Sequence, residues 1–411
     1  MKASSWVMVP LEAICAPCRY PIGDGDHGAI KPSMYTTSGI PYIRVADIGE
    51  GELLKDKLVY ITADVHRNNP KSHLFPGDIV ISKTGTIGNV AIIPSDMPKA
   101  NTTSSVGKIT LDAGKVIPRF VLYYMLSPRF QADIWAVSHK SAQPGFNIRD
   151  LKKFKVPLPP LKDQEHIVKL LDEADELRKL RALANRRTDE LIPALFHEMF
   201  GDLRTNERGW HSGNLGDLCT DVVDCPHSTP IYAPCQTPYP CVRSSDIQKS
   251  RFDWSTTKYV IEEEYLRRIK NFVPIRNDIV FCREGARLGN AAQLTDDTTI
   301  CLGQRMMLFR ASPQASTSEF LWAVLQTELI QQQIASQVGG SASPHLNVRD
   351  IKKFTCVIPP LSLQEAFSGM VAEVRKMETA QASSRLCLEA LFESVLHRAF
   401  NGGQFSGSVY D

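Results

Sequence analysis

The sequence predicts an α+β protein: two similar mixed α/β globules separated by two long helices that pack as an antiparallel coiled coil, with a pseudo-two-fold internal repeat. The main observation is that residues 147–165 align with residues 347–365 without a gap. A seven-residue apolar pattern follows each copy, and short apolar runs broken by turn residues precede it. The shared positions are Asn147/Asn347, Arg149/Arg349, Asp150/Asp350, Lys152/Lys352, Lys153/Lys353, Phe154/Phe354, Pro159/Pro359, Pro160/Pro360, Leu161/Leu361, Gln164/Gln364 and Glu165/Glu365.

The length of the chain supports this division. At 411 residues it is too long for one ordinary domain, and 43% hydrophobic residues suffice for more than one core. The repeat predicts a first globule at 1–155, a central helical spacer at 156–202, a second globule at 203–355, and a C-terminal helical spacer and tail at 356–411.

Short apolar runs rich in β-branched residues predict the strands of the first globule, at 40–48, 78–82 and 90–93. Glycine-rich stretches at 23–28 and 85–88 predict loops. Apolar residues at helical spacing predict one helix from about 119 to 136.

The second globule repeats this order. Residues 42–48 match 241–247, 76–80 match 276–280, the loop at 83–89 matches 283–290 with one residue inserted, and a helix is expected at 319–334. Asp24 and His27 correspond to Asp224 and His227.

Each long helix is expected to start after a proline pair and to carry two apolar seams. One seam comprises Ile167, Ala174, Arg181, Thr188 and Leu195, with Phe367, Val374, Gln381, Leu388 and Val395 in the second copy. The other comprises Leu170, Leu177, Ala184 and Leu191, with Met370, Met377, Ser384 and Leu391. We expect the two helices to bury these seams against each other. The alternative is that each helix folds back onto its own globule.

Ten cysteines in a chain of this length do not indicate a disulfide scaffold. Cys15 and Cys18 form a C-x-x-C pair, but Cys18 has no counterpart in the second copy, so a zinc or redox site is not expected. Neither a metal nor a cofactor is predicted. The start of the chain lacks an apolar run and no stretch reaches the length of a membrane span, which predicts a soluble cytoplasmic protein without a membrane partner.

Sequence motifs of common enzyme sites are absent. The chain has no G-x-x-x-x-G-K-[ST] phosphate loop, no strand-linked G-x-G-x-x-G and no H-E-x-x-H. It also has no Asn/Asp-Pro-Pro-Tyr/Phe quartet of the kind that amino-methylating enzymes carry. A binding protein is therefore favoured over an enzyme, and no catalytic residue is predicted.

Charge is unevenly distributed between globules and helices. Residues 1–155 carry 19 Lys and Arg against 13 Asp and Glu, whereas residues 156–202 carry 7 against 10. Two similar globules on a rigid spacer suit a partner with two similar sites at fixed separation. Double-stranded DNA, whose reading faces recur every ~34–36 Å, is such a partner, and the helices would act as a ruler.

A family resemblance supports this interpretation. The segment 146–202, with its PLPPL run, Gln164, Glu165 and a terminal LFHEMFGD, resembles the central repeat of type I restriction–modification specificity subunits. The duplicated DGDHG and DCPHS loops, and the DIV strand followed by a Gly-Asn loop, are similar to their target-recognition domains. The resemblance covers nearly the whole chain in the family's order of elements.

The resemblance implies a DNA-reading subunit of a restriction system without chemistry of its own. Its partners would be double-stranded DNA with a two-part asymmetric target, two DNA adenine methyltransferase subunits and, in many systems, restriction–translocation subunits. The helices would fix the gap and dock the methyltransferases. Two alternatives stay open here: the recognition chain of a bipartite type II restriction–methylation enzyme, and a protein scaffold that binds no DNA.

Candidate DNA-binding residues fall into two groups, because phosphate contacts position a protein whereas base contacts specify the sequence. Residues around the shared glycine loops and lysine pairs are candidates for phosphate contacts: Lys83, Thr84, Thr86, Asn89, Lys152, Lys153, Arg283, Arg287, Asn290, Lys352 and Lys353. Polar runs that differ between the copies are candidates for base contacts: Lys140, Ser141, Gln143, Gln337, Ser341, Ser343 and His345. For the glycines, the alternative is a turn that needs only positive φ. For the polar runs, it is a plain loop. His27 and His227 are shared, which favours a structural or backbone-facing role.

Overall fold

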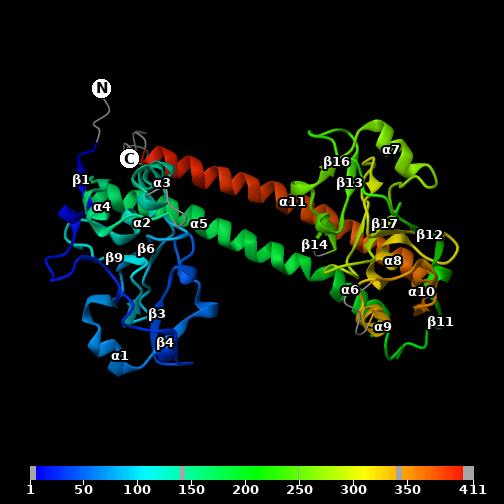
Figure 1. The fold of residues 1–411 in the computed structure, drawn as a ribbon, viewed down its shortest axis with the longest axis horizontal. Helices are drawn as coiled ribbons and strands as arrows, with labels where there is room; N and C mark the ends of the chain where they lie inside the picture. Colours follow the sequence, from blue (N-terminus) through cyan, green and yellow to red (C-terminus); the bar gives the residue numbers. More distant parts are fainter. Residues whose placement is uncertain (1–5, 139–143, 249, 339–344, 401–411) are drawn as a thin grey trace, which may run out of the picture. The chain divides into compact units, whose positions relative to one another are not determined.

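The computed structural model describes residues 6–138, 144–248, 250–338 and 345–400. It divides into two compact units (Figure 1). Unit 1 comprises residues 1–182 and 383–411, and unit 2 comprises residues 183–382. Each unit contains one globule and parts of both long helices.

Two four-stranded sheets form the globule of unit 1. The first has the order β2 (Ile22–Asp24), β9 (Val106–Ile109), β6 (Ile79–Ser82) and β7 (Val90–Ile92), all antiparallel. The second has the order β4 (Val59–Ile61), β3 (Ile40–Ile43), β8 (Ala100–Thr102) and β5 (His73–Leu74), with β3 and β8 parallel. A separate pair joins β1 (Met8–Pro10) to β10 (Lys155–Pro157). Both central strands β6 and β9 are buried along their whole length, as their apolar sequences predict.

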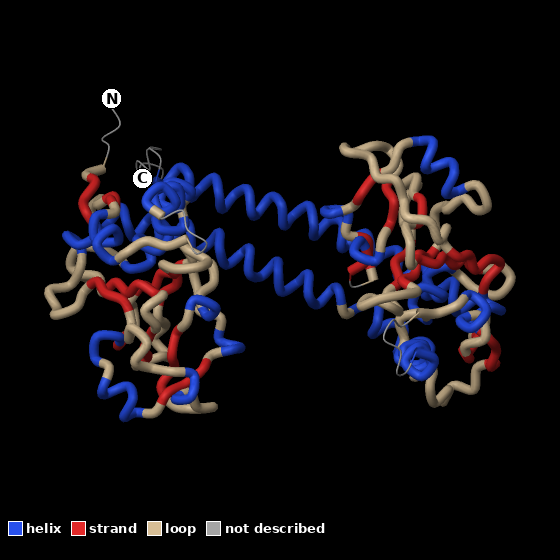
Figure 2. The backbone as a smooth tube through the Cα atoms, in the orientation of Figure 1, coloured by secondary structure: helices blue, strands red, loops and turns tan. Residues whose placement is uncertain are grey.

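Helices α2 (Pro118–Leu126), α3 (Pro128–Val137) and α4 (Ile148–Lys153) lie on one side of the first sheet of unit 1 (Figures 1 and 2). Helix α1 (Ala63–Asn68) lies away from them, beside the second sheet. The single helix predicted at 119–136 is wrong, because Ser127 separates α2 from α3 and its hydroxyl accepts a hydrogen bond from the Phe130 amide at 3.4 Å. Pro128 then occupies the first turn of α3, where its missing N–H costs nothing.

Unit 2 repeats this architecture. Its main sheet has the order β12 (Cys219–Asp224), β20 (Met306–Ala311), β17 (Ile279–Cys282) and β18 (Ala291–Gln293). The smaller sheets are β16 (Lys258–Tyr259) with β13 (Pro240–Val242) and β19 (Cys301–Leu302), β14 (Ile247–Gln248) with β15 (Arg251–Phe252), and β11 (His211–Asn214) with β21 (Thr355–Ile358). Its helices are α7 (Glu262–Ile269), α8 (Ser318–Val324), α9 (Glu328–Val338) and α10 (Val348–Ile351).

The central helical segment consists of two helices, α5 (Leu161–Asp189) and α6 (Leu191–Phe200), and not of one continuous helix. Pro193 explains the break, because a proline ring clashes with the carbonyl four residues earlier, here that of Asp189 at the end of α5. The C-terminal segment has no proline at the equivalent place and forms the single helix α11 (Leu361–Phe400).

Within each unit the long helices run antiparallel, as the sequence predicts. In unit 2, Gln381 of α11 donates a hydrogen bond to Thr188 of α5 at 2.9 Å, whereas the earlier Phe367 of α11 packs edge-to-face with the later Phe196 of α6, with 5.6 Å between ring centroids. In unit 1 the Arg178 guanidinium lies over the Phe392 ring, 4.4 Å from its centroid.

The predicted second seam is wrong by one residue. Leu171 and Val371 are fully buried, whereas Leu177, Met370 and Met377 are 48%, 43% and 45% exposed. The reason is that the helices pack on a globule as well as on each other, which selects an apolar stripe with the period of a globular helix. Both packing alternatives are therefore realised in unit 1: one core cluster contains Leu171 of α5, Phe400 of α11 and Phe120 of the globule.

The shared glutamine of the repeat fastens each long helix to a globule. Gln164 is fully buried; its Oε1 accepts from the Ile117 amide at 2.8 Å, and its Nε2 donates to the carbonyls of Lys115 and Pro159 at 3.1 and 2.9 Å. Gln364 makes the same three bonds, with Thr317 at 3.1 Å and with Ala315 and Pro359 at 3.1 and 2.9 Å. The duplicated Pro-Pro-Leu-x-x-Gln motif is thus a structural clamp.

All cysteines in the chain are free thiols. Burial raises the pKa of Cys15, Cys282 and Cys356 to about 12, so these side chains carry their protons at neutral pH. Among the described residues, no group of His, Cys, Asp and Glu side chains is arranged to hold a metal ion, and no described helix has the length and apolar character needed to cross a lipid bilayer.

Candidate nucleic-acid interface

In unit 1 two separate stretches of candidate residues lie together. The glycine loop that connects β6 to β7 lies beside the segment that follows the polar run at 139–143. The Gly85 amide donates to the Pro144 carbonyl at 3.0 Å, and the Phe146 amide donates to the Lys83 carbonyl at 3.1 Å. Thr84 and Gly145 form an isolated antiparallel bridge. In unit 1 the glycine loop therefore contacts the residues that directly follow the polar run at 139–143.

Unit 2 has the same arrangement. The Leu346 amide donates to the Arg283 carbonyl at 2.9 Å, and Glu284 forms an antiparallel bridge with His345. The same framework thus flanks two polar runs of different sequence, which is the arrangement expected if each globule reads a different half-site.

The two cations that begin the glycine loops are mostly buried. The Lys83 side chain is 14% exposed, and its Nζ lies 3.1 Å from an Asp24 carboxylate oxygen. The Arg283 side chain is 9% exposed, and its Nη1 lies 2.5 Å from both Asp224 oxygens, while its Nε donates to the Leu346 carbonyl at 2.9 Å. Both cations tie loops of their own globule together, and a phosphate contact by either stays a prediction.

Two further candidates also hold loops in place. The Asn89 side-chain amide donates to the Ile48 carbonyl at 3.1 Å. The Arg287 guanidinium donates to the Ile247 carbonyl at 3.1 Å and to the Ser245 carbonyl at 2.6 Å. Since Ile48 and Ile247 are equivalent in the repeat, two different side chains perform the same structural task.

The glycines of these loops are explained by the alternative stated above, a turn whose backbone needs a positive φ. Gly88 and Gly289 have φ of +91° and +93°, and a Cβ at either would lie within 2.6 Å of a glutamine side chain. These glutamines, Gln131 and Gln331, donate to the Gly88 and Gly289 carbonyls at 2.9 and 3.3 Å. The glycines are required by backbone conformation and by this close approach.

Other candidates lie on the surface. Thr86, Lys152, Lys153, Lys352, Lys353, Gln337 and His345 are exposed, and Thr84 and Asn290 are half-buried. Lys152 and Lys153 are in the last turn of α4, and Lys352 and Lys353 directly follow α10. The remaining candidates, Lys140, Ser141, Gln143, Ser341 and Ser343, lie outside the described residues.

His27 and His227 are absent from the predicted contact residues, but the structure places both beside the glycine loops. Their side chains are 69% and 76% exposed, and each Nε2 faces the carboxylate three residues earlier, at 2.9 Å from Asp24 and 3.5 Å from Asp224. The duplicated Asp-x-x-His spacing was the available sequence signal. Exposure, which the sequence does not encode, separates these histidines from structural ones.

Different side chains anchor the histidine loops in the two units. In unit 1 the Asp26 carboxylate accepts from the Tyr42 hydroxyl at 2.8 Å and from the Ile30 amide at 2.5 Å. In unit 2 the fully buried Arg268 side chain donates to the carbonyls of Pro226 and Ser228, both at 3.2 Å. The loop is preserved although its supports have diverged.

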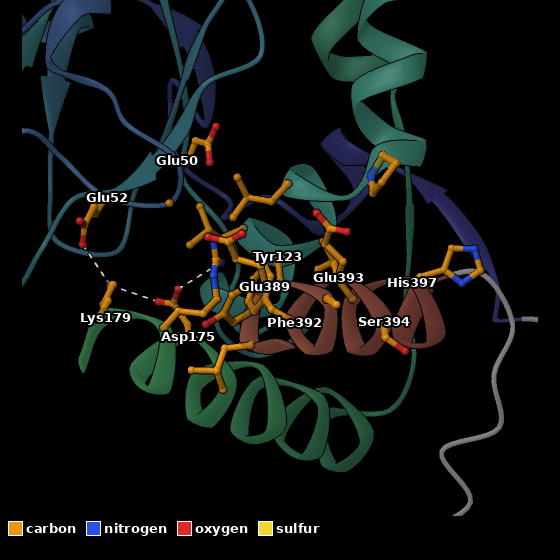
Figure 3. A pocket seen from close by; sticks show the side chains of 18 of the residues that line it. Glu50, Glu52, Tyr123, Asp175, Lys179, Glu389, Phe392, Glu393, Ser394 and His397 are labelled. Atoms are coloured by element: carbon orange, nitrogen blue, oxygen red, sulfur yellow. Dashed lines mark hydrogen bonds and ion pairs between the residues drawn. The ribbon is translucent and has the colours of Figure 1, made fainter. Parts of the chain in front are cut away.

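A second kind of site lies where a long helix ends on a globule. In unit 1 a groove of about 1080 Å³ is lined by α2, α5 and the last turns of α11 (Figure 3). Tyr123 and Phe392 are among the residues that line it, and Lys179 forms ion pairs with both Glu52 and Asp175, each at 3.1 Å (Figure 3).

Unit 2 has a related groove of about 540 Å³, lined by α6, α8 and α9. Equivalent positions of the repeat line both grooves, including Ile192 and Phe392 and the exposed His197 and His397. Each unit therefore has one groove between a helix end and the globule's own helix pair.

Comparison with known proteins decides the family. Residues 29–187 and 207–370 each match the family described as type I restriction modification DNA specificity domain. The chain belongs to this family. The two matched segments contain the two glycine loops and the starts of both long helices.

Individual relatives agree with this assignment. The chain is 28% identical over 187 residues to the type I restriction enzyme EcoBI specificity subunit of Escherichia coli. This match covers 44% of this chain and 39% of that protein. It is 20% identical over 306 residues to the MjaVIII specificity subunit of Methanocaldococcus jannaschii, covering 70% and 71% of the two chains. The chain thus spans well under half of the first relative's length.

Among solved structures, the fold is similar to that of a type I restriction–modification S subunit from M. genitalium. The match has a TM-score of 0.58 with 15% sequence identity and covers 97% of both chains. At this identity the similarity concerns the fold.

Proposed function

We propose that this chain is the specificity subunit of a type I restriction–modification complex, which binds double-stranded DNA at a two-part asymmetric target. The observation that carries the proposal is the duplicated framework around two unlike polar runs. One globule reads each half of the target, with the shared residues contacting phosphates or supporting loops and the divergent runs contacting bases.

Exposed cations support the phosphate-binding part of this proposal. Lys152 and Lys153, and their counterparts Lys352 and Lys353, are exposed, and none of the four forms an ion pair with a described residue. Each stands beside the segment that continues from a divergent run. Cations in such positions neutralise backbone phosphates and give binding that weakens as salt rises.

The catalytic work belongs to partners in this proposal. Two DNA adenine methyltransferase subunits dock on the helices, one at each groove, and restriction–translocation subunits join through them. Support comes from the two related grooves and from exposed apolar side chains on the adjoining helices: Leu177, Leu180 and Leu391 in unit 1, and Leu191, Met370 and Met377 in unit 2. Exposed apolar side chains grouped on helix faces are typical of protein interfaces.

The functional parts follow the division made from the sequence. We assign target recognition to residues 1–155 and 203–355, and spacing and docking to residues 156–202 and 356–411. Membership in the family favours this role over the recognition chain of a bipartite type II enzyme.

Co-expression tests the proposal. The chain would be produced in a methylation-free host with the methyltransferase encoded beside its gene, and modified adenines would be mapped by long-read sequencing. A two-part asymmetric motif that is modified only when this chain is present is the expected result. Methylation that is absent, or unchanged without the chain, would favour the scaffold that binds no DNA.

Exchange of one globule is the matched control. Replacing residues 203–355 with the corresponding globule of a relative should change one half of the motif and leave the other half intact. A change in both halves would contradict the assignment of one half-site to each globule.

A further inference from the structure

Each unit contains a chain of three charged or titratable side chains with a central carboxylate. In unit 1, Asp24 binds Lys83 through one oxygen at 3.1 Å and His27 through the other at 2.9 Å. In unit 2, Asp224 binds Arg283 at 2.5 Å and His227 at 3.5 Å. The cation changes between copies, but the order cation, carboxylate, imidazole does not.

In each set of three side chains, the imidazole is the most exposed member. In unit 1 the cation, carboxylate and imidazole are 14%, 15% and 69% exposed. In unit 2 the values are 9%, 31% and 76%. A histidine that only filled a core would be buried at this point. Within the described residues neither imidazole has another hydrogen-bond partner, so its second ring nitrogen is available to a ligand.

Both imidazoles stand next to the segments that follow the divergent runs. Lys83 accepts a backbone hydrogen bond from Phe146, and the Arg283 side chain donates to the Leu346 carbonyl. His27 also has a φ of +51°, a left-handed conformation that is uncommon outside glycine and clusters at binding sites. The imidazoles are therefore positioned at the candidate DNA interface.

The charges of each cation–carboxylate–imidazole set favour binding of an anion once the imidazole is protonated. The buried cation already neutralises the carboxylate, so a protonated imidazole leaves a net positive charge at the surface. Other charged groups beside the two loops are engaged. Asp26 accepts from Tyr42 and Ile30, and Arg267 and Arg268 of α7, which donate to Ser228 next to His227, both pair with Glu264. A polyanion would favour the charged imidazole, because an opposite charge stabilises the protonated form.

We propose that His27 and His227 bind phosphodiester groups of DNA, one in each globule, and that each is oriented by the carboxylate three residues before it. The proposal rests on the function proposed above and adds a contact pair with a specific signature. Histidine side chains as a class change charge between about pH 5 and 8, so the expected signature is DNA binding that is tighter at pH 6 than at pH 8 and is accompanied by proton uptake.

The test uses the full chain in complex with its methyltransferase subunits and a duplex containing the mapped target. Variants are His27→Gln, His227→Gln and the double variant, with His211→Gln as control, because His211 is an exposed histidine on β11. DNA affinity is measured by fluorescence anisotropy at pH 6 and pH 8 over a range of salt. Proton uptake is measured by calorimetry in buffers of different ionisation enthalpy.

We expect each single variant to bind roughly threefold to tenfold more weakly at pH 6, to lower the salt slope by about one and to bind nearly normally at pH 8. Proton uptake should fall by about half in each single variant and vanish in the double variant. His27→Arg, which carries a permanent charge, should bind DNA more tightly than the wild type at pH 8, by about the factor that His27→Gln loses at pH 6. His211→Gln should behave as wild type.

Three results would overturn the proposal while leaving the proposed function intact: proton uptake that persists in the double variant, affinity at pH 6 that no variant changes, or an equal loss at both pH values, which indicates a supporting role. If the wild-type complex does not bind DNA at all, the proposed function fails together with this contact.

Discussion

Gln164 and Gln364 illustrate how a residue shared between repeats can be purely structural. Each is fully buried and satisfies three backbone groups of a helix start and a globule. Conversely, His27 and His227 are shared and exposed. Presence in both repeats therefore does not distinguish a structural residue from a candidate DNA contact, whereas the burial of its side chain does.

Gln364→Ala should lower the free energy of unfolding by about 2–4 kcal/mol, because it leaves one buried amide and two buried carbonyls without partners. Chemical denaturation followed by circular dichroism measures this loss. The neighbouring exposed Glu365→Ala is the control and should change stability by less than about 0.5 kcal/mol. Equal effects of the two substitutions would argue against the clamp.

The buried thiols give a pH prediction. Because burial raises the pKa of Cys15, Cys282 and Cys356 to about 12, these thiols keep their protons to a higher pH in the folded state than in the unfolded state. Their contribution to stability is complete below about pH 9, the ordinary value of the thiol, and is lost as pH rises toward 12.

Denaturation midpoints at pH 7.5, 9 and 10.5 should therefore decline, and Cys356→Ala should decline less steeply than wild type. Thiol labelling of the native protein at pH 8 should modify the exposed Cys18, Cys235 and Cys387 and spare the buried thiols. Rapid labelling of Cys282 in the native state would contradict the burial on which the argument depends.

At the level of elements, each globule's glycine loop is supported by a helix outside its sheet. Gln131 of α3 and Gln331 of α9 both donate to the carbonyl of the loop's second glycine. The loop also borders the segment that follows the divergent run, so helix, loop and this following segment form one connected support. A recognition segment can change its sequence on such a frame without losing its position.

The exposed apolar side chains of the helices allow the proposed methyltransferase docking to be tested. Leu180→Glu in unit 1 and Met377→Glu in unit 2, at residues 54% and 45% exposed, should each weaken association with one methyltransferase by about tenfold or more. Unfolding stability should hardly change, since both residues face solvent in the isolated chain. Mass photometry of the co-expressed complex reports the number of bound subunits.

The exposed Lys169→Glu on α5 provides the matched control and should leave the assembly intact. If both apolar variants retain two methyltransferases, the docking surface lies elsewhere.

At the level of the whole molecule, the repeat gives the chain two similar globules and two long helices that contact each other within both units. The pair Arg178 and Phe392 in unit 1, and the pair Thr188 and Gln381 in unit 2, bracket the middle of the helices. A change in helix length should therefore be made in both helices together, because an insertion in one alone would break the pairing of the other.

Inserting four residues after Arg181 and four after Ala382 should lengthen the spacer by about 6 Å and shift the gap between half-sites by roughly one to two base pairs. Each half-site sequence should stay unchanged. Methylation mapping reads out both quantities. A fixed gap with an altered half-site would show that the helices do not set the spacing.

The sequence by itself determined the duplication, the α+β class, the family resemblance and the two long helices, because these depend on local pattern and on repeated motifs. The glycine loops around Gly88 and Gly289 were located correctly for the same reason. Both residues have a positive φ, which favours glycine, and the presence of glycine in the sequence indicates such a turn.

Only the tertiary structure decided which residues are buried and which are free to bind. It moved the apolar seam from Leu170 to Leu171, because a globule packs against the helix pair. It split three predicted helices: Ser127–Pro128 separates α2 from α3, residues 325–327 separate α8 from α9, and Pro193 accompanies the break between α5 and α6. It engaged Lys83 and Arg283 with carboxylates and left His27 and His227 exposed beside them. Burial and pairing arise from contacts between segments far apart in the chain, and no local pattern encodes them.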